Sequence, residues 1–273
     1  MKANIAALAT RDWLHEFALS LCSVLALASI VTPLLILHGV HTGVVESMRE
    51  QLMKDPAVLV IMPAGSRGAG FEEAFIEEIA RRPECDFVIG RTRDVASELQ
   101  VRAAQGGSLS IALEPTAPGD PLLLRHGCVM PEAAGSDQLE VVLSAPAAGR
   151  LKVQAGAYLE ASLGRRLASG KLDRLKLRLK VVDVLPPSAT GMESGFVAMP
   201  LLLAIQDFRD GYQSALLGVS GQTGEIAPGD GRYFESFRVY VHNIDEVEGL
   251  EEWFKSRDVL VKTRSRDIAN IRS

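Results

Sequence analysis

The sequence predicts an α+β protein that begins with one membrane-spanning helix and continues into a mixed domain with a β-rich insertion. Three observations predict this class. Residues 17–37 are strongly apolar and carry no formal charge. Two strand–helix–strand patterns occur at 58–93 and 237–263. The segment 95–185 between them reads as a series of strands, which makes the second pattern a return to the first subdomain.

Residues 17–37 have the length and composition of a transmembrane helix. About 21 residues at about 1.5 Å each span roughly 31 Å, which matches a hydrocarbon core of about 30 Å. The hydroxyl groups in this segment can bond to carbonyls one turn back, and Pro33 is tolerated as a kink. We therefore expect one transmembrane helix, with the lipid bilayer as its partner.

A cleaved signal peptide and a buried core helix are the alternatives for this segment. Ala26-Leu27-Ala28 resembles a signal-peptide cleavage site. Cleavage there would leave a strongly apolar new terminus. A helix that is apolar on all sides also has no face to offer to solvent, as a core helix of a soluble protein usually does. Both alternatives are disfavoured for these reasons.

Composition and motifs argue against several classes of function. The chain has 273 residues and a net charge of −5 without a basic block, which argues against nucleic acid as a partner. Cys22 lies in the membrane segment, and we expect Cys85 and Cys128 to be free thiols rather than a disulfide. No GxxxxGK[ST], HExxH, GxSxG or CxxC motif occurs. We therefore expect no enzyme activity, no catalytic residue and no cofactor.

The membrane helix is expected to continue as a stalk to about residue 56. Apolar residues recur at helical spacing beyond residue 43, and Glu50 and Lys54 form an i,i+4 pair in the favourable order. Asp55-Pro56 is then expected to end the helix. The stalk would join the membrane segment to the folded domain.

The first turns of the stalk contain two glycines and two histidines. Gly39 and Gly43 lower the helix propensity and are the places where the stalk can loosen. His38 and His41 are three residues apart, a spacing that allows a metal site. No third ligand lies nearby in the sequence, so we interpret them as histidines at the membrane interface and expect no bound metal.

The two strand–helix–strand patterns are expected to pair into one open sheet. Their elements are VLVIM (58–62), FEEAFIEEIARR (71–82) and DFVIGRTR (86–93), followed by FRVYVHNI (237–244), DEVEGLEEWFKSR (245–257) and DVLVKT (258–263). In the second pattern we expect Trp253 and Leu250 to pack on a sheet surface made by Val239, Val241, Leu260 and Val261.

The insertion consists of predicted strands and one late helix. VASELQVRA and SLSIALEPT flank a turn at Gly106-Gly107, LEVVLSA (139–145) follows, and AYLEASLGRRL and RLKLRLKVVDVL flank ASGKLD. A loop at 186–195, the short strand FVAMP and the helix LLLAIQDFRDG come next.

One strand of the insertion has an unusual outer face. Leu175, Leu177, Leu179 and Val181 alternate with Arg174, Lys176, Arg178 and Lys180, which places leucines on one face and cations on the other. The cationic face can bind an anionic lipid or substrate. The simpler interpretation is a solvated face that also deters edge-to-edge aggregation.

The order of these parts is similar to the N-terminal half of an ABC-transporter permease of the FtsX/MacB/LolC type. The phrases that carry the resemblance are VVESMREQLMKDP, LSAPAAGRLKVQAGAYLEASL, RLKLRLKVVDVLPP, PLLLAIQDFRDG and VYVHNIDEVEGLEEWFKSRDVLVKTRSRDIANI. The resemblance implies four parts, one of which is made of two separate stretches of the chain. They are an anchor with stalk at 1–56, a porter-like subdomain from 57–94 and 232–264, a β-rich inserted subdomain at 95–231, and the start of a second membrane-associated helix at 265–273.

In that family the helix is the first of four, and the large domain lies between helices one and two. The resemblance therefore implies a cell inner (cytoplasmic) membrane protein with a cytoplasmic N-terminus and a periplasmic domain beyond about residue 40. It implies mechanotransmission: a separate cytoplasmic ABC ATPase subunit hydrolyses ATP, and the permease passes the motion to its extracytoplasmic domain. The implied partners are that ATPase, a second permease copy in a homo- or heterodimer, and an extracytoplasmic protein, lipoprotein or peptide substrate.

Three further membrane helices are expected beyond Ser273, so the chain resembles an N-terminal fragment of such a permease. The rival hypothesis is a single-pass membrane-anchored sensor or binding domain that is complete as it stands. The reading frame downstream of Ser273 distinguishes the two.

Overall fold

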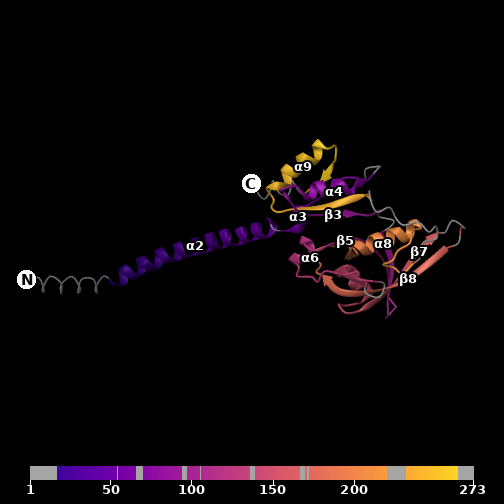
Figure 1. The fold of residues 1–273 in the computed structure, drawn as a ribbon. Helices are drawn as coiled ribbons and strands as arrows, with labels where there is room; N and C mark the ends of the chain where they lie inside the picture. The colour runs from indigo at the N-terminus through magenta and orange to yellow at the C-terminus, as the bar shows by residue number, and fades with distance from the viewer. Residues whose placement is uncertain are drawn as a thin grey trace, which may run out of the picture. The chain divides into compact units, whose positions relative to one another are not determined.

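The computed structural model describes residues 17–53, 55–65, 70–93, 97–104, 106–135, 139–166, 170, 172–219 and 232–263. The chain divides into two compact units, Met1–Met53 and Lys54–Ser273, which are described separately below (Figure 1). The fold is mixed α+β with one N-terminal apolar helix, as predicted. The predicted start of a second membrane-associated helix at 265–273 lies outside the described residues.

The first unit is described from Phe17 onward and consists of the single helix α2 (Phe17–Met53). Pro33 lies inside the helix without ending it. Among the described residues α2 is the one helix long and apolar enough to cross a membrane, through Leu21–Val40, which fits a membrane anchor or a signal sequence. None of this span is buried, so the core-helix alternative is wrong for the described chain. The predicted hydroxyl bonds are confirmed where Ser23 Oγ donates to the Leu19 carbonyl at 2.9 Å and Ser29 Oγ to the Ala26 carbonyl at 2.8 Å.

The second unit begins with a short helix that was not predicted, and its last two residues fall within the strand expected at 58–62. Helix α3 (Pro56–Leu59) is capped by Asp55, whose carboxylate accepts a hydrogen bond from the Ala57 amide at 2.9 Å. The predicted strand at 58–62 therefore starts later, as β1 (Val60–Pro63). Asp followed by Pro is a signal for the start of a helix as well as for the end of one, because proline fits the first helical position.

Two strand–helix–strand halves pair into one antiparallel sheet of order β12-β1-β11-β3, as expected. Its remaining strands are β3 (Cys85–Arg91), β11 (Ser236–Val241) and β12 (Val261–Lys262). Each half is split, because β11 lies between β1 and β3, and β1 lies between β11 and β12. This is the split β-α-β arrangement. A second, two-stranded sheet pairs β2 (Phe71–Glu72) with β10 (Tyr233–Phe234).

Helices α4 (Glu73–Ala80) and α9 (Glu246–Ser256) lie together on one face of the four-stranded sheet (Figure 1). An aromatic cluster holds them there. Phe237 of β11 contacts Phe254 of α9 with ring centroids 5.2 Å apart, and Phe75 of α4 stacks on Trp253 at 5.9 Å. Because neighbouring residues of a strand point to opposite faces, Arg238 points to the other side of the sheet.

The predicted packing around Trp253 is only partly confirmed. Leu250 is fully buried as expected, but Leu260 is 74% exposed and does not belong to the packed surface. The predicted strand at 258–263 shortens to the two residues of β12. Trp253 is half-buried, with the guanidinium groups of Arg82 and Arg257 at 5.4 and 5.2 Å from its ring.

The inserted segment folds into a closed barrel of order β4-β5-β9-β6-β8-β7, and this closure was not predicted. The strands are β4 (Glu98–Ala103), β5 (Ser108–Thr116), β6 (Leu139–Ser144), β7 (Tyr158–Arg166), β8 (Leu172–Leu185) and β9 (Ser194–Ala198). The β4–β5 pair is an antiparallel hairpin, as predicted, and β7 and β8 also pair antiparallel. The β5–β9 and β6–β8 pairs are parallel, and β4 pairs with β7 to close the barrel.

Three helices accompany the barrel strands. They are α6 (Pro121–Arg125), α7 (Ala145–Leu151) and α8 (Met199–Asp210), and the first two were not predicted. Buried side chains of α7 and α8 join the apolar core inside the barrel. That core is tight at Gly195 of β9, where an added Cβ would lie 3.0 Å from side-chain atoms of both Ile111 and Val141. The barrel is therefore a packed core rather than a channel.

Candidate functional site

The junction between the sheet subdomain and the barrel subdomain is crossed by arginine–carboxylate ion pairs, one of which is buried. We define the sheet subdomain as the two sheets with α3, α4 and α9, and the barrel subdomain as the six-stranded barrel with α6, α7 and α8. Four ion pairs between described residues join them: Arg91–Glu114, Arg93–Asp210, Arg232–Asp207 and Arg238–Asp120. The arginine always belongs to the sheet side and the carboxylate to the barrel side.

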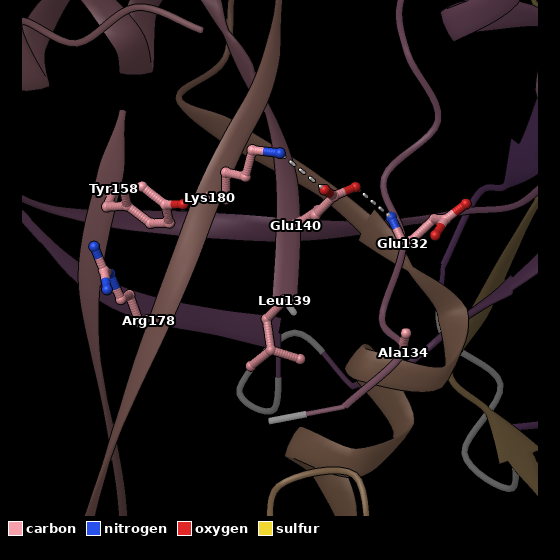
Figure 2. Close-up of a pocket in the computed structure, with 7 residues that line it drawn as sticks. All are labelled: Glu132, Ala134, Leu139, Glu140, Tyr158, Arg178 and Lys180. Atoms are coloured by element: carbon pink, nitrogen blue, oxygen red, sulfur yellow. Dashed lines mark hydrogen bonds and ion pairs between the residues drawn. The ribbon is translucent and has the colours of Figure 1, made fainter. Parts of the chain in front are cut away.

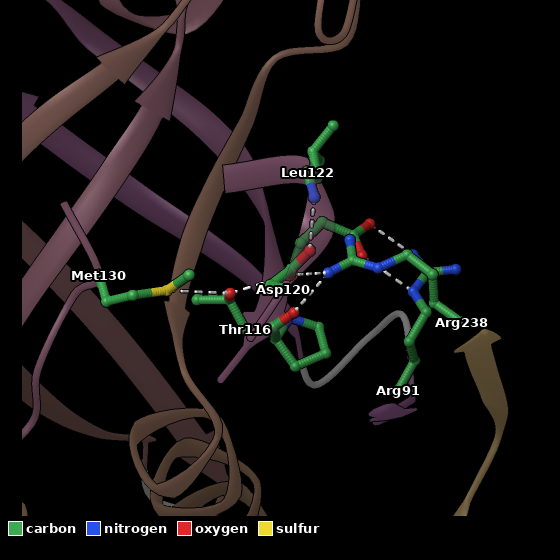
Figure 3. Close-up of polar contacts among 8 residues, drawn as sticks. Arg91, Thr116, Asp120, Leu122, Met130 and Arg238 are labelled. Carbon is green, nitrogen blue, oxygen red and sulfur yellow. Dashed lines mark hydrogen bonds and ion pairs between the residues drawn. The ribbon is translucent and has the colours of Figure 1, made fainter. Parts of the chain in front are cut away.

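Arg238 and Asp120 form the centre of this junction (Figure 3). Arg238 Nη2 donates to Asp120 Oδ2 at 2.5 Å and to the Pro115 carbonyl at 3.1 Å. Thr116 Oγ1 donates to the same carboxylate oxygen at 2.9 Å, and the Leu122 amide donates to Asp120 Oδ1 at 3.0 Å. Arg238 is 6% exposed and Asp120 is 0% exposed. One buried carboxylate therefore caps α6 and neutralises an arginine from the opposite subdomain.

A second arginine reinforces the same place. Arg91 of β3 binds the Glu114 carboxylate of β5 with both nitrogens of its fork, at 2.9 Å from Nε and 2.5 Å from Nη2. Two-pronged pairs of this kind fix the relative orientation of their partners as well as attracting them. The Arg238 guanidinium also lies 5.9 Å from the ring of Phe196 on barrel strand β9. The two subdomains are thus held in position by ion pairs, by the fixed geometry of the two-pronged Arg91–Glu114 pair, and by the contact of Arg238 with Phe196.

Burial changes the protonation behaviour of two groups at the junction. Burial acts to lower the pKa of Arg238, but the neighbouring Tyr240, Asp120 and Glu114 outweigh it, so the pKa of Arg238 is raised. Burial raises the pKa of Tyr240 to about 12, and Asp120 and Glu114 add to this effect while Arg238 opposes it. Both groups keep their protons throughout the physiological pH range.

Sequence reasoning missed this junction. Arg238 and Asp120 are separated by 118 positions, and neither belongs to a recognised motif. Two weak signals were present: an arginine inside the apolar strand FRVYVHNI, and an Asp-Pro pair at 120–121 typical of a helix start. The buried arginine needs a partner, but the sequence alone does not say which carboxylate supplies it.

A polar pocket of about 390 Å³ lies on the outside of the barrel (Figure 2). It is lined by Glu132, Ala134, Leu139, Glu140, Tyr158, Arg178 and Lys180. Glu140 accepts hydrogen bonds from Lys180 Nζ at 3.5 Å and from the Glu132 amide at 3.2 Å. The Arg178 guanidinium lies 3.9 Å from the ring centroid of Tyr158. The pocket offers charged groups of both signs to a polar ligand.

The described cysteines and histidines contribute no side chain to the ion pairs of the junction or to the lining of the pocket. Cys85 and Cys128 are free thiols, as predicted. Burial raises the pKa of each to about 11, helped by Asp86 at Cys85 and by Asp183 at Cys128, so both stay protonated at neutral pH. His38 lies in α2, while the side chain of His41 is outside the described structure. No group of three or more potential ligands that could hold a metal ion occurs among the described residues.

No protein-family model matches this chain, and no curated protein matches its sequence.

Proposed function

We propose that the chain is part of the membrane (permease) subunit of an ABC transporter of the mechanotransmission type, similar to FtsX, MacB and LolC. In this proposal α2 is the first membrane helix of the permease in the cytoplasmic membrane. The second unit is a porter-like extracytoplasmic domain with an inserted barrel. A separate cytoplasmic ATPase drives a permease dimer, and the domains act on a protein, lipoprotein or peptide outside the membrane.

The continuity of α2 is the observation that carries the proposal. The helix has 37 residues, or about 55 Å at about 1.5 Å per residue. Its apolar span ends at Val40, and the helix continues without interruption to Met53. A stalk of this kind transmits motion along its axis, whereas an anchor needs no helix beyond the bilayer.

The construction of the second unit also supports the proposal. A domain that transmits motion must be rigid, so its sheet and barrel subdomains must not move relative to each other. Four arginine–carboxylate pairs, one of them fully buried, hold the sheet and barrel subdomains together. The order of parts, with a split β-α-β sheet interrupted by one inserted lobe, agrees with the order that the resemblance implies.

A co-purification experiment tests this function. The complete gene, read beyond codon 273, is expressed with an affinity tag in its native host, and its membranes are solubilised in mild detergent. We expect an ATP-binding-cassette ATPase to co-purify, and its hydrolysis of ATP to depend on the permease. Purification without any such ATPase, together with a reading frame that has no further membrane helices, would refute the proposal.

A single-pass anchored sensor or binding domain is the alternative function. One membrane-spanning helix among the described residues fits it equally well. That alternative predicts a chain that is active without an ATPase, so the same experiment separates the two.

A further inference from the structure

The hairpin of β7 and β8 carries a row of four cations on the outer face of the barrel. We call Arg174, Lys176, Arg178 and Lys180 the cationic row. All four side chains are exposed, and they alternate with inward-facing residues of β8. At about 3.3 Å per residue the row is about 20 Å long. Across the hairpin their partners in register are Gly164, Ser162, Glu160 and Tyr158.

Three of these four cations are not ion-paired in the described structure. Arg174, Lys176 and Arg178 form no ion pair with any described residue, and Lys180 has only the 3.5 Å contact with Glu140. The inner face of the same hairpin is different, because Arg165 pairs with Asp173 at 2.9 Å. Charges two residues apart on one strand face repel each other, so the row does not stabilise the barrel by itself.

Protection of a free strand edge accounts for only part of the row. Strand β6 pairs with β8 from Leu179 onward, so Lys180 lies between two paired strands. Arg174 and Lys176 lie where β8 pairs with β7 alone, and there they do oppose edge pairing. The last two cations of the row, Arg178 and Lys180, lie beyond Arg174 and Lys176 along β8 and line the pocket together with Tyr158 and Glu140.

The β7 residues beside the row leave space for a second chain. Ser162 and Gly164 face Lys176 and Arg174 in register. An added Cβ at Gly164 would meet nothing within 4 Å, and its backbone has no positive φ that would require glycine. Glycine inside a strand weakens it and often marks the close approach of another backbone. Packing among the described residues gives no other reason for glycine at this position.

We propose that the cationic row is the docking surface for an acidic protein segment in extended conformation. Alternate side chains of an extended segment repeat at about 6.7 Å, which matches the spacing of the row and allows one carboxylate per cation. The segment lies over Ser162 and Gly164, and its end reaches the pocket beside Tyr158.

Carboxylates on the same face favour a protein partner with spaced negative charges over an anionic bilayer. Glu160 lies in register between Arg178 of β8 and Arg102 of β4, and Glu132 and Glu140 line the pocket at the end of the row. A uniformly negative surface would meet repulsion at each of these carboxylates. A segment with gaps in its charge avoids them, so interleaved charges provide specificity for a protein.

Peptide binding to the full chain in uncharged nanodiscs tests the proposal. The probe is a labelled peptide of about ten residues that alternates Glu and Thr, compared with one that alternates Lys and Thr. The row variant is Arg174→Gln with Lys176→Gln. The matched control is Lys152→Asn with Lys262→Gln, which removes the same charge elsewhere on the exposed surface. Asn suits position 152, where φ is 54°.

We expect the acidic peptide to bind, with affinity that falls as salt rises, and the row variant to bind it about tenfold more weakly than the control variant. Gly164→Val should fold normally, because valine favours strands, and should lose binding through steric exclusion. Reversal of the row, with all four of its cations replaced by glutamate, should transfer binding to the basic peptide. That gain excludes misfolding as the cause of the loss.

Equal binding by the row variant and the control variant would overturn the proposal, as would no binding of the acidic peptide by the unmodified chain. Row-dependent binding to phosphatidylglycerol vesicles without binding of the peptide would also overturn it and would identify a lipid surface instead. The assay needs no ATPase, so its failure leaves the proposed transport function standing, and the failure of that function leaves the peptide result unchanged.

Discussion

Arg238 shows how one residue can join two subdomains. It comes from the middle of a sheet strand, and its charge is satisfied by a carboxylate at the start of a helix on the barrel side. Taking two charges out of water is expensive, and the pair is favourable only while both partners and their additional hydrogen bonds remain. Arg238 therefore stabilises the junction only together with Asp120.

Removal of one half of this pair should be strongly destabilising. We expect Arg238→Met to lower the free energy of unfolding by about 3–5 kcal/mol, because it leaves the Asp120 carboxylate buried without its cation. Combined with Asp120→Asn, the same change should cost clearly less. Chemical denaturation of the single and double variants, followed by circular dichroism, measures the coupling. Additive effects within about 0.5 kcal/mol would mean that the pair does not act as a unit.

Ionisation of Tyr240 is expected to lower the stability of the folded protein at alkaline pH. Its pKa rises from an ordinary value of 10.0 to about 12 in the folded protein, so folding favours the protonated phenol. The resulting stability is complete below pH 10 and is lost as the pH rises through 12. It amounts to at most about 3 kcal/mol.

Tyr240→Phe should remove this alkaline loss. We expect the unfolding free energy of the unmodified chain to decline more steeply between pH 10 and 12 than that of the variant, measured by denaturant titration at each pH. Parallel curves over that interval would show that Tyr240 ionises as readily in the folded as in the unfolded state.

At the scale of elements, two neighbouring side chains of the aromatic cluster under α9 differ in how deeply they are buried. Phe254 is fully buried, whereas Trp253 is half-buried and lies against Phe75 and two arginines. Phe254→Ala should therefore cost about 3–5 kcal/mol of unfolding free energy, and Trp253→Ala should cost less. Thermal unfolding of both variants in one buffer decides the order. A larger loss for Trp253→Ala would place the tryptophan in the core, as the sequence first indicated.

The strands of the barrel were predictable because their faces alternate. In β8 the exposed cations from Arg174 to Lys180 alternate with less exposed or buried residues, as the period-two pattern indicated. Three short helices were missed for a common reason. Each begins with an Asp or Ser cap followed within two residues by proline, at Asp55, Asp120 and Ser144. These signals are as strong as those of long helices, but the helices are too short for a period to appear.

The closure of the barrel and the charged junction could not be predicted. Closure depends on pairs such as Ala112 with Ser194, and no local pattern fixes such a distant parallel register. The junction depends on which carboxylate meets Arg238, which is a question of tertiary position. By contrast, the cationic row was visible in the sequence, because it lies on one strand and needs no partner to be recognised.

At the scale of the whole molecule, topology is the first consequence of the proposed function. In a variant with Cys22, Cys85 and Cys128 replaced by serine, Ser188→Cys places one thiol at an exposed position of the second unit. We expect a membrane-impermeant maleimide to label it in cells whose outer membrane is permeabilised and whose cytoplasmic membrane is intact. Labelling only after the cytoplasmic membrane is broken would place the domain in the cytoplasm.

In the proposed function α2 acts as a lever between the membrane and the extracytoplasmic domain. The test uses the complete permease with its ATPase in nanodiscs, with a spin label at Glu252→Cys in each of its two copies. About seven residues are inserted after Gly43, either as a flexible Gly-Ser segment or as an Ala-rich helical segment of about two turns. The helical insert is the matched control, since it lengthens the stalk equally but keeps it stiff.

The decisive measurement is the change in distance between the two labels when ATP is added. The lever account predicts a change in the unmodified permease and with the helical insert, and none with the Gly-Ser insert, while all three hydrolyse ATP at similar rates. An ATP-dependent change of equal size with the Gly-Ser insert, or no change in the unmodified permease, would contradict it.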